Sequence, residues 1–252
     1  MADKANPNII AKANLDKIPP LPSKLSPSLS HKERLLSYIL KLIVISAAVI
    51  GTILSAIAGR RYFMGGSKVF MYFTIQSNLA IALICAAESI ILAQKKPINP
   101  VWSVIKFVGT VSITLTGIVF VFVLAPTMGT SAWNIQNILT HVVVPLIAVI
   151  DFFVLAPSTQ IEYKNIIYVI IPPLLYAVYA GIAYIKGWEF SDGINYPYFF
   201  LNWGSPAGAF GFSKELPFMG TVWWIISLFL FLILIGFLYL KIARLIKKAR
   251  TK

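Results

Sequence analysis

Four hydrogen-bonding side chains interrupt an apolar run in the first third of the chain. The stretch YFTIQSN at 72–78 contains Thr74, Gln76, Ser77 and Asn78, and mainly apolar residues flank it on both sides. Thr74 and Asn78 are four residues apart, so in a helix they lie on one face. A threonine hydroxyl is a weak nucleophile that becomes reactive when a neighbouring base removes its proton. The chemistry of this stretch therefore depends on which base lies near Thr74.

A suitable base occurs in another apolar run, NILTHVVVPLIAVID at 137–151. Histidine is the side chain best suited to accept a proton near neutral pH, and His141 lies in the first half of this run. If the two runs cross a membrane in opposite directions, Thr74 and His141 lie at a similar depth, roughly 10 Å below one surface. The alternative is a structural histidine that hydrogen-bonds a hydroxyl group between packed helices. The residues predicted to orient the imidazole or to bind an oxyanion are Asn78, Gln76 and Asn137.

Three charged side chains are expected near the other ends of these spans. Glu88 follows Thr74 by nearly four helical turns, so it stays on the same helix face. Lys106 and Asp151 are expected at a comparable depth on two further helices. Because charges inside a membrane are usually paired, we predict that the three side chains form a cluster. A structural role is one interpretation of this cluster, and a path for protons or cations is the other.

The composition indicates which class of protein positions these residues. Of the 252 residues, 58% are hydrophobic and 12% are charged, and the mean hydropathy is +0.79. A soluble domain carries about 25% charged residues, and a transmembrane helix needs about 20 consecutive apolar residues. We predict an all-α membrane protein, a six-transmembrane-helix bundle with spans at about 36–58, 68–93, 102–125, 136–156, 166–185 and 221–243.

The basic residues predict how this bundle is oriented. Residues 1–34 combine prolines, lysines and serines, so we expect a disordered basic tail before a transmembrane domain at 35–245 and a second basic tail at 246–252. Most of the 22 lysines and arginines lie on the side of the N-terminus, so both termini are predicted to be cytoplasmic, in a multi-pass protein of the cell membrane. The net charge of +13 then indicates contact with anionic lipid headgroups rather than with nucleic acid.

Two further features concern packing. The external loop predicted at 186–220 is rich in aromatic residues, which favours either a belt at the membrane interface or a lid over a site. Prolines at 145, 172 and 173 are expected to kink their helices. Small residues recur every fourth position in the first span, which lets helix backbones approach closely within the bundle or in a homodimer. These small residues are Ala47, Gly51, Ser55 and Gly59.

No metal site and no cofactor are expected. Cys85 is the only cysteine, and the two histidines are His31 in the tail and His141 in a span. A zinc site needs about four clustered nitrogen or sulfur ligands. A single cysteine also excludes a disulfide bond within the chain.

The pattern resembles the androgen-induced protein family of integral membrane hydrolases, and more closely its bacterial six-span relatives. The matching stretches are YFTIQSN at 72–78, HVVVPLIAVID at 141–151 and YPYFFLN at 196–202. The resemblance covers about 35–245. It implies a threonine hydrolase that acts on a membrane lipid or a lipid-like ester, with Thr74 as the nucleophile and His141 as its general base.

Two other classes of function fit the same residues. A transporter or small channel would use the polar face around Thr74 and the deeper charged residues as a path across the membrane. A non-catalytic membrane scaffold would bind lipid or a partner, and its polar residues would have only structural roles.

Overall fold

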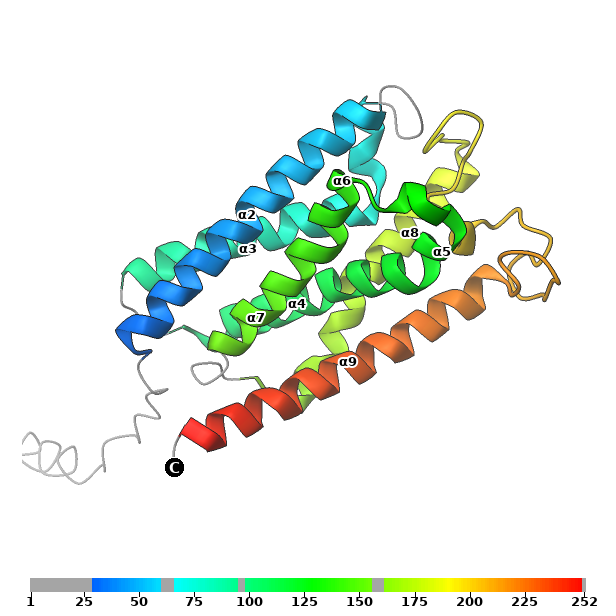
Figure 1. Cartoon of the computed structure of the whole chain (residues 1–252). Coiled ribbons are helices and arrows are strands. Elements are labelled where there is room, and N and C mark those ends of the chain that lie inside the picture. The colour runs from blue at the N-terminus through cyan, green and yellow to red at the C-terminus, as the bar shows by residue number, and fades with distance from the viewer. Residues whose placement is uncertain (1–28, 60–65, 95–97, 156–160, 251–252) are drawn as a thin grey trace, which may run out of the picture.

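The computed structural model describes residues 29–59, 66–94, 98–155 and 161–250. Within these ranges the chain is helical, and β-pairing is limited to two isolated bridges in the loop after residue 186. Six helical segments are long and apolar enough to cross a membrane. The predicted bundle of six transmembrane helices is therefore confirmed (Figure 1).

Each span is one helix or a series of consecutive helical segments. In chain order the segments are α2 (His31–Gly59); η1 (Gly66–Met71) and α3 (Phe73–Ala93); α4 (Pro100–Val119), η2 (Phe120–Leu124), α5 (Ala125–Met128) and η3 (Gly129–Ala132); α6 (Ile135–Ile138), η4 (Leu139–Val143) and α7 (Val144–Leu155); η6 (Tyr163–Ile170) and α8 (Ile171–Ile185); η7 (Phe199–Leu201) in the loop; and α9 (Thr221–Arg250). Two of these segments, η2 and η4, are π-helical turns, and the other η segments are 3-10 helices.

The first and last helices extend further than predicted. The prediction of a tail up to residue 34 is wrong at its end, because α2 begins at His31. The Ser30 and Glu33 side chains each accept a hydrogen bond from the other residue's backbone N–H, which forms a capping box at the start of this helix. At the other end α9 continues to Arg250. Residues 1–28 and 251–252 of the two predicted tails lie outside the described residues.

The second and third spans also differ from their predicted ends. The long helix of the second span begins at Phe73 rather than at 68, so Thr74 lies in the first turn of α3. The third span continues past 125 to Ala132, and Pro126 lies within the first turn of its segment α5. Proline is tolerated there because the first backbone donors of a helical segment have no partner within it.

Helix α4 lies at the centre of the bundle. It contacts α3 and α7 on one side, and η6 and α9 on the other, whereas α2 lies across α3 and α7 (Figure 1). The π-turn η4 contacts both α3 and α4. The second and fourth spans, which carry the predicted nucleophile and base, are therefore neighbours.

The small residues of the first span are used inside the bundle. Ala47, Gly51 and Ser55 are buried. A methyl group added at Gly51 would lie 2.7 Å from the side chain of Thr140 and 3.2 Å from that of Leu139. This close approach joins α2 to the π-turn η4 of the same chain. A homodimer through the first helix stays a prediction.

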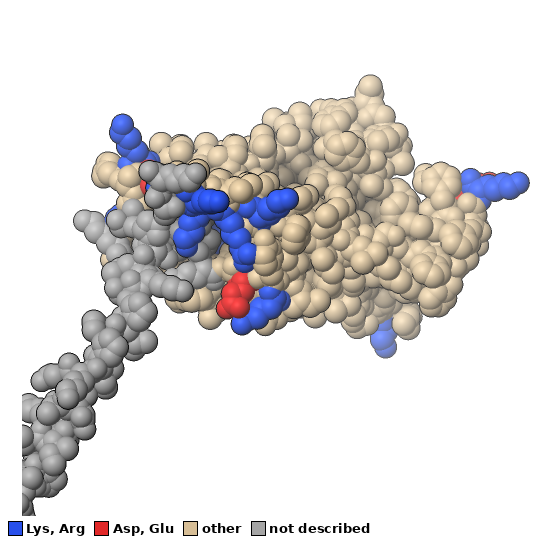
Figure 2. Space-filling view, turned by 90° about the horizontal axis from the view of Figure 1, so that it is seen from below, with Lys and Arg blue, Asp and Glu red and all other residues tan. Residues whose placement is uncertain are grey.

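The two ends of the transmembrane domain lie on the same side of the bundle. Arg250 donates a hydrogen bond to Glu33, which ties the end of α9 to the start of α2. Basic side chains gather at this end, and an uncharged band separates them from the few at the opposite end (Figure 2). We call these the terminal side and, after the loop at 186–220, the loop side. The placement of the terminal side in the cytoplasm stays a prediction.

The loop at 186–220 divides into two parts. The segment around η7 folds back onto the bundle, and its Phe200 and Leu201 are 5% exposed. Farther along, Phe210 and Phe212 are 64% and 76% exposed. The first part is buried as a lid would be, and the second has the exposure expected of an aromatic belt at a membrane interface.

Candidate active site

Thr74 and His141 meet inside the bundle. The Thr74 hydroxyl oxygen lies 3.2 Å from Nε2 of His141. Both residues are buried, with 8% and 9% of their surfaces exposed. This is hydrogen-bond distance between a potential nucleophile and a potential base, so the predicted juxtaposition exists.

The hydrogen bonds on the other side of the ring define which nitrogen carries the proton. Nδ1 of His141 lies 3.1 Å from the carbonyl oxygen of Asn137 and 3.0 Å from the Thr140 hydroxyl. A carbonyl oxygen only accepts, and the Thr140 hydroxyl donates its own proton to the Gln136 carbonyl. Nδ1 is therefore the protonated nitrogen, and Nε2 presents its lone pair to the Thr74 hydroxyl.

A π-helical turn sets the position of this imidazole. In η4 the Val144 N–H donates to the Leu139 carbonyl, five residues back. Pro145, which has no N–H, follows immediately and cannot donate to the His141 carbonyl. The proline thus displaces the regular helix pattern, and such turns occur often at functional sites. The predicted kink at this proline stays a prediction, whereas the π-helical turn beside it was not predicted.

A second π-turn places an aromatic ring against the histidine. Phe120, the first residue of η2, stacks on the His141 ring with a centroid separation of 4.0 Å and an interplanar angle of 22°. Behind this stack, a methyl group added at Gly117 would lie 2.9 Å from the His141 carbonyl oxygen. The absence of a side chain at Gly117 therefore lets α4 approach η4 closely enough for the rings to stack.

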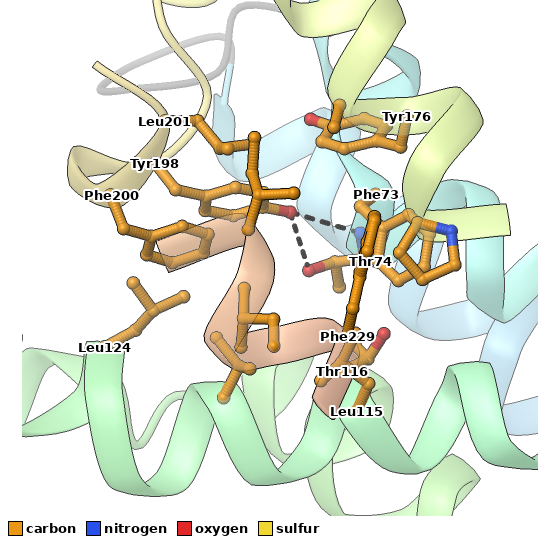
Figure 3. A pocket seen from close by; sticks show the side chains of 15 residues that line it. Phe73, Thr74, Leu115, Thr116, Leu124, Tyr176, Tyr198, Phe200, Leu201 and Phe229 are labelled. Atoms are coloured by element: carbon orange, nitrogen blue, oxygen red, sulfur yellow. Dashed lines mark hydrogen bonds between the residues drawn. The ribbon is translucent and has the colours of Figure 1, made fainter. Parts of the chain in front are cut away.

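Tyr198 from the loop is the site residue that sequence reasoning missed. Its hydroxyl oxygen lies 3.3 Å from the Thr74 hydroxyl and accepts a hydrogen bond of 3.3 Å from the Thr74 N–H (Figure 3). Burial raises the pKa of Tyr198, although its hydrogen bonds with Thr74 act in the opposite direction. The phenol therefore stays protonated and can donate. The stretch YPYFFLN contained this residue, but nothing in its spacing indicated contact with α3.

The start of α3 adds a partial positive charge near Thr74, which is the second residue of this helix. The Thr74 N–H donates to Tyr198, and the Ile75 and Gln76 N–H groups donate to the Tyr72 carbonyl. The charge therefore comes from the aligned peptide dipoles of the helix start rather than from free donors. Negative charge that develops at Thr74 would be stabilised by this helix end and by the Tyr198 hydroxyl.

Of the three predicted supporting residues, Asn78 bridges the two helices. Its side-chain amide donates to the carbonyl oxygens of Thr74 at 2.8 Å and of Thr140 at 3.0 Å. It therefore holds the helix of Thr74 against the turn that carries His141, but it does not contact the ring. Asn78 is fully buried, so no water competes for these bonds.

The other two supporting residues act differently from the prediction. Gln76 is exposed and donates to the Phe70 carbonyl, so its predicted role at the imidazole is wrong. The Asn137 side chain donates to the Ala132 carbonyl, and only its backbone carbonyl reaches the ring of His141. The sequence contained one sign of this contact, because Asn137 and His141 are four residues apart. In a helix this spacing brings a backbone carbonyl near the side chain one turn later.

A cavity opens beside Thr74 on the side away from His141. Its volume is about 60 Å³, which is below the range of about 300–1,000 Å³ typical of ligand pockets, so the cavity must widen to hold a lipid-sized ligand. Apolar side chains from α3, α4, α8, α9 and the loop form most of its wall (Figure 3). Its polar lining comes from Thr74, Thr116 and the tyrosines 176 and 198. Thr74 therefore lines the cavity, and His141 does not.

The predicted charge cluster forms on the terminal side and is larger than expected. Lys106 Nζ lies 2.5 Å from Asp151 and 3.2 Å from Glu88. Lys41, which was not part of the predicted cluster, lies 2.8 Å from Asp151 and 3.1 Å from Glu88. The Ser37 hydroxyl donates to Asp151 at 2.6 Å. Two lysines and two carboxylates give the cluster no net charge, and all four are almost fully buried.

Apolar packing separates this cluster from Thr74 and His141. Ile81, Ile113, Val144 and Ala148 lie between the two levels on their helices and are fully buried. In the described part of the chain, no three His, Cys, Asp or Glu side chains are grouped as a metal site requires. The hydroxyl–imidazole pair and the charge cluster are thus two separate polar sites.

No family model, curated protein or solved structure matches this chain. The resemblance to the androgen-induced protein family accordingly stays a prediction.

Proposed function

We propose that this integral membrane protein is a hydrolase of lipid-like esters, with Thr74 as its nucleophile and His141 as its general base. The observation that carries the proposal is the hydrogen bond of 3.2 Å between the Thr74 hydroxyl and Nε2 of His141. Nδ1 is occupied by the Asn137 carbonyl, so the basic nitrogen is the one that faces the hydroxyl.

The geometry supports a two-step acyl transfer. In the first step Nε2 of His141 takes the hydroxyl proton, and the Thr74 oxygen attacks the ester carbonyl carbon. The Tyr198 hydroxyl and the start of α3 stabilise the negative charge on the carbonyl oxygen. The alcohol leaves with the proton from His141, and the acyl group stays on Thr74. In the second step water attacks this ester through the same base and releases the acid.

The shape of the bundle favours hydrolysis over transport. A path across the membrane would join the polar residues of the loop side to the charge cluster on the terminal side. The apolar layer at Ile81, Ile113 and Val144 interrupts that path in the described residues. The cavity beside Thr74, by contrast, offers a mainly apolar surface to a substrate at the hydroxyl.

The test is turnover and covalent labelling by the purified full-length protein. We expect it to cleave members of a panel of long-chain esters and to react with a fluorophosphonate probe. Thr74→Ala is expected to abolish labelling and to lower turnover by about 10³-fold or more. His141→Gln is expected to lower turnover similarly, because glutamine can hydrogen-bond but cannot accept the proton.

Thr127→Ala is the matched control, because Thr127 is an exposed threonine whose hydroxyl bonds only a local carbonyl. Fluorophosphonate labelling that persists in Thr74→Ala would remove the nucleophile assignment. Wild-type protein without turnover or labelling would favour a non-catalytic scaffold.

A further inference from the structure

A groove runs along the outer surface of the bundle between α3, α4 and the fifth span. Its volume is about 660 Å³, and it is open to the surroundings of the protein. Ala80 and Ile84 line it from α3, Val108 from α4, and Leu175 from α8. All four are apolar, and Leu175 is 64% exposed. In a membrane this surface faces lipid rather than water.

Along α3 the groove is about as long as one leaflet of a bilayer is thick. Along α3 its lining extends from Phe73 to Ile84, which are eleven positions apart or about 16 Å at 1.5 Å per residue. The hydrocarbon core of a bilayer is about 30 Å thick, so each leaflet contributes about 15 Å. The groove begins at the first residue of α3 on the loop side, where a lipid headgroup would lie.

Hydrocarbon is the occupant that suits this lining. Water would find few hydrogen-bond partners among these side chains, and a void would lose dispersion contacts with the wall. A single extended acyl chain can fill a narrow apolar groove of this length. Gln76, which is exposed at the loop-side end of the lining, can hydrogen-bond the ester or headgroup of that lipid.

One aromatic pair separates the groove from the cavity beside Thr74. Phe73 and Tyr176 line both hollows, and their rings lie 5.2 Å apart. The Tyr176 hydroxyl donates to the Met71 carbonyl, which fixes that ring. The backbone of Phe73 is next to Thr74 in sequence, so a rotation of the Phe73 side chain would open the wall beside the hydroxyl.

We infer that this groove binds one acyl chain of a phospholipid from the loop-side leaflet, and that the Phe73–Tyr176 pair is a lateral gate to the cavity. The binding site is independent of catalysis. Delivery through the gate rests on the proposed hydrolase function.

The binding site is tested in lipid nanodiscs that contain a phosphatidylcholine with a diazirine in one acyl chain. After irradiation, we expect groove peptides from α3, α4 and α8 to carry severalfold more label than the lipid-facing peptide of α9 around Leu234. Ala80→Trp fills the groove and is expected to lower groove labelling severalfold. Leu83→Trp is the matched control, because Leu83 is 71% exposed on the same helix and does not line the groove.

Even labelling of all lipid-facing helices would overturn the proposal, as would unchanged labelling of the groove in folded Ala80→Trp protein. If Ala80→Trp does not fold, Leu175→Trp fills the groove from the opposite wall and replaces it. Thr74→Ala should keep wild-type labelling, so failure of the hydrolase proposal would leave the groove standing. If both hold, Ala80→Trp raises KM for long-chain esters.

Discussion

At the scale of single residues, the site is a chain of four polar groups. The Asn137 carbonyl accepts a hydrogen bond from Nδ1–H of His141, and Nε2 of His141 accepts a hydrogen bond from the Thr74 hydroxyl. The Thr74 hydroxyl can in turn accept a hydrogen bond from Tyr198. Among the residues that the structure describes, no carboxylate contacts His141, so the imidazolium formed during reaction would be stabilised by a backbone dipole and by the face of Phe120.

Tyr198 provides the first prediction. Tyr198→Phe removes the hydroxyl near Thr74 and keeps the ring that covers the cavity. We expect kcat to fall by about 10²–10³-fold with little change in KM, as for the loss of one oxyanion donor. The measurement is steady-state hydrolysis of the best ester of the panel.

Tyr196→Phe is the control, because it makes the same change two residues away in the loop. An equal loss of kcat in both variants would mean that the loop responds as a whole and that Tyr198 is not a donor. A rise in KM alone would assign Tyr198 to substrate binding.

At the scale of helical segments, proline sets the local geometry of the site. Pro145 follows the π-turn that carries His141, and Pro126 follows the π-turn that begins at Phe120. Each proline lies two residues after its five-residue turn. The two stacked rings, of Phe120 and His141, are thus both carried by a π-turn near a proline. Residues 172 and 173 likewise follow a 3-10 helix, η6, at the start of α8. Three of the six spans therefore change helix type just before a proline.

The contact between these segments gives the second prediction. Gly117→Ala would push α4 away from η4, because the new methyl group would lie 2.9 Å from the His141 carbonyl oxygen and 3.1 Å from Pro145. We expect a loss of about 1–3 kcal/mol in the free energy of unfolding and a fall in kcat as the rings separate. Thermal unfolding in detergent and ester hydrolysis measure the two effects.

Gly181→Ala in α8 is the matched control. The nearest atom to its added methyl group is 3.9 Å away, so we expect no loss of stability. If Gly117→Ala is as stable and active as this control, the close approach of α4 and η4 does not position the histidine.

At the scale of the whole molecule, the charge cluster joins four helices. Lys41, Glu88, Lys106 and Asp151 come from α2, α3, α4 and α7, and their charges balance. Removing one partner of a buried ion pair leaves an uncompensated charge. This lowers the stability of the fold more than replacing both partners with apolar side chains does. This position and balance indicate that the cluster stabilises one arrangement of the helices on the terminal side.

The third prediction tests that balance. We expect Lys106→Met to lower the free energy of unfolding by about 3–5 kcal/mol, because one negative charge is left unpaired. Adding Glu88→Gln returns the cluster to neutrality and should restore part of the loss. The exposed Lys164, which pairs with Glu162 at 2.9 Å, is the control, and Lys164→Met should change thermal unfolding little.

A double variant less stable than Lys106→Met would contradict the role of charge balance. Proton or cation flux in proteoliposomes that disappears in Glu88→Gln would instead support the interpretation of the cluster as a path.

The orientation of the bundle gives the fourth prediction. Cys85 is buried, so the wild-type protein offers little background to a membrane-impermeant maleimide. Lys214→Cys in the loop should be labelled on intact cells. Ala249→Cys, near the end of α9, should be labelled only after the membrane is opened, because basic residues favour the cytoplasm. The reverse pattern would place the terminal side outside.

The sequence alone determined the class of the fold. Long apolar runs have one stable solution in a bilayer, because every backbone polar group must bond within its own helix. The number of spans, the inward face of Thr74 and the shared level of Thr74 and His141 follow from helix length and periodicity, which are local properties. The same reasoning grouped Lys106 with Asp151, since unpaired charges are too costly at that depth.

Only the tertiary structure decided which groups complete the site. The contact of Tyr198 with Thr74 joins residues 124 positions apart, and the stack of Phe120 on His141 depends on two π-turns. Lys41 joined the charge cluster because α2 crosses α7, which its own sequence does not reveal. Helical periodicity describes the faces within one segment, whereas these contacts depend on how separate segments pack and on backbone turns that depart from that periodicity.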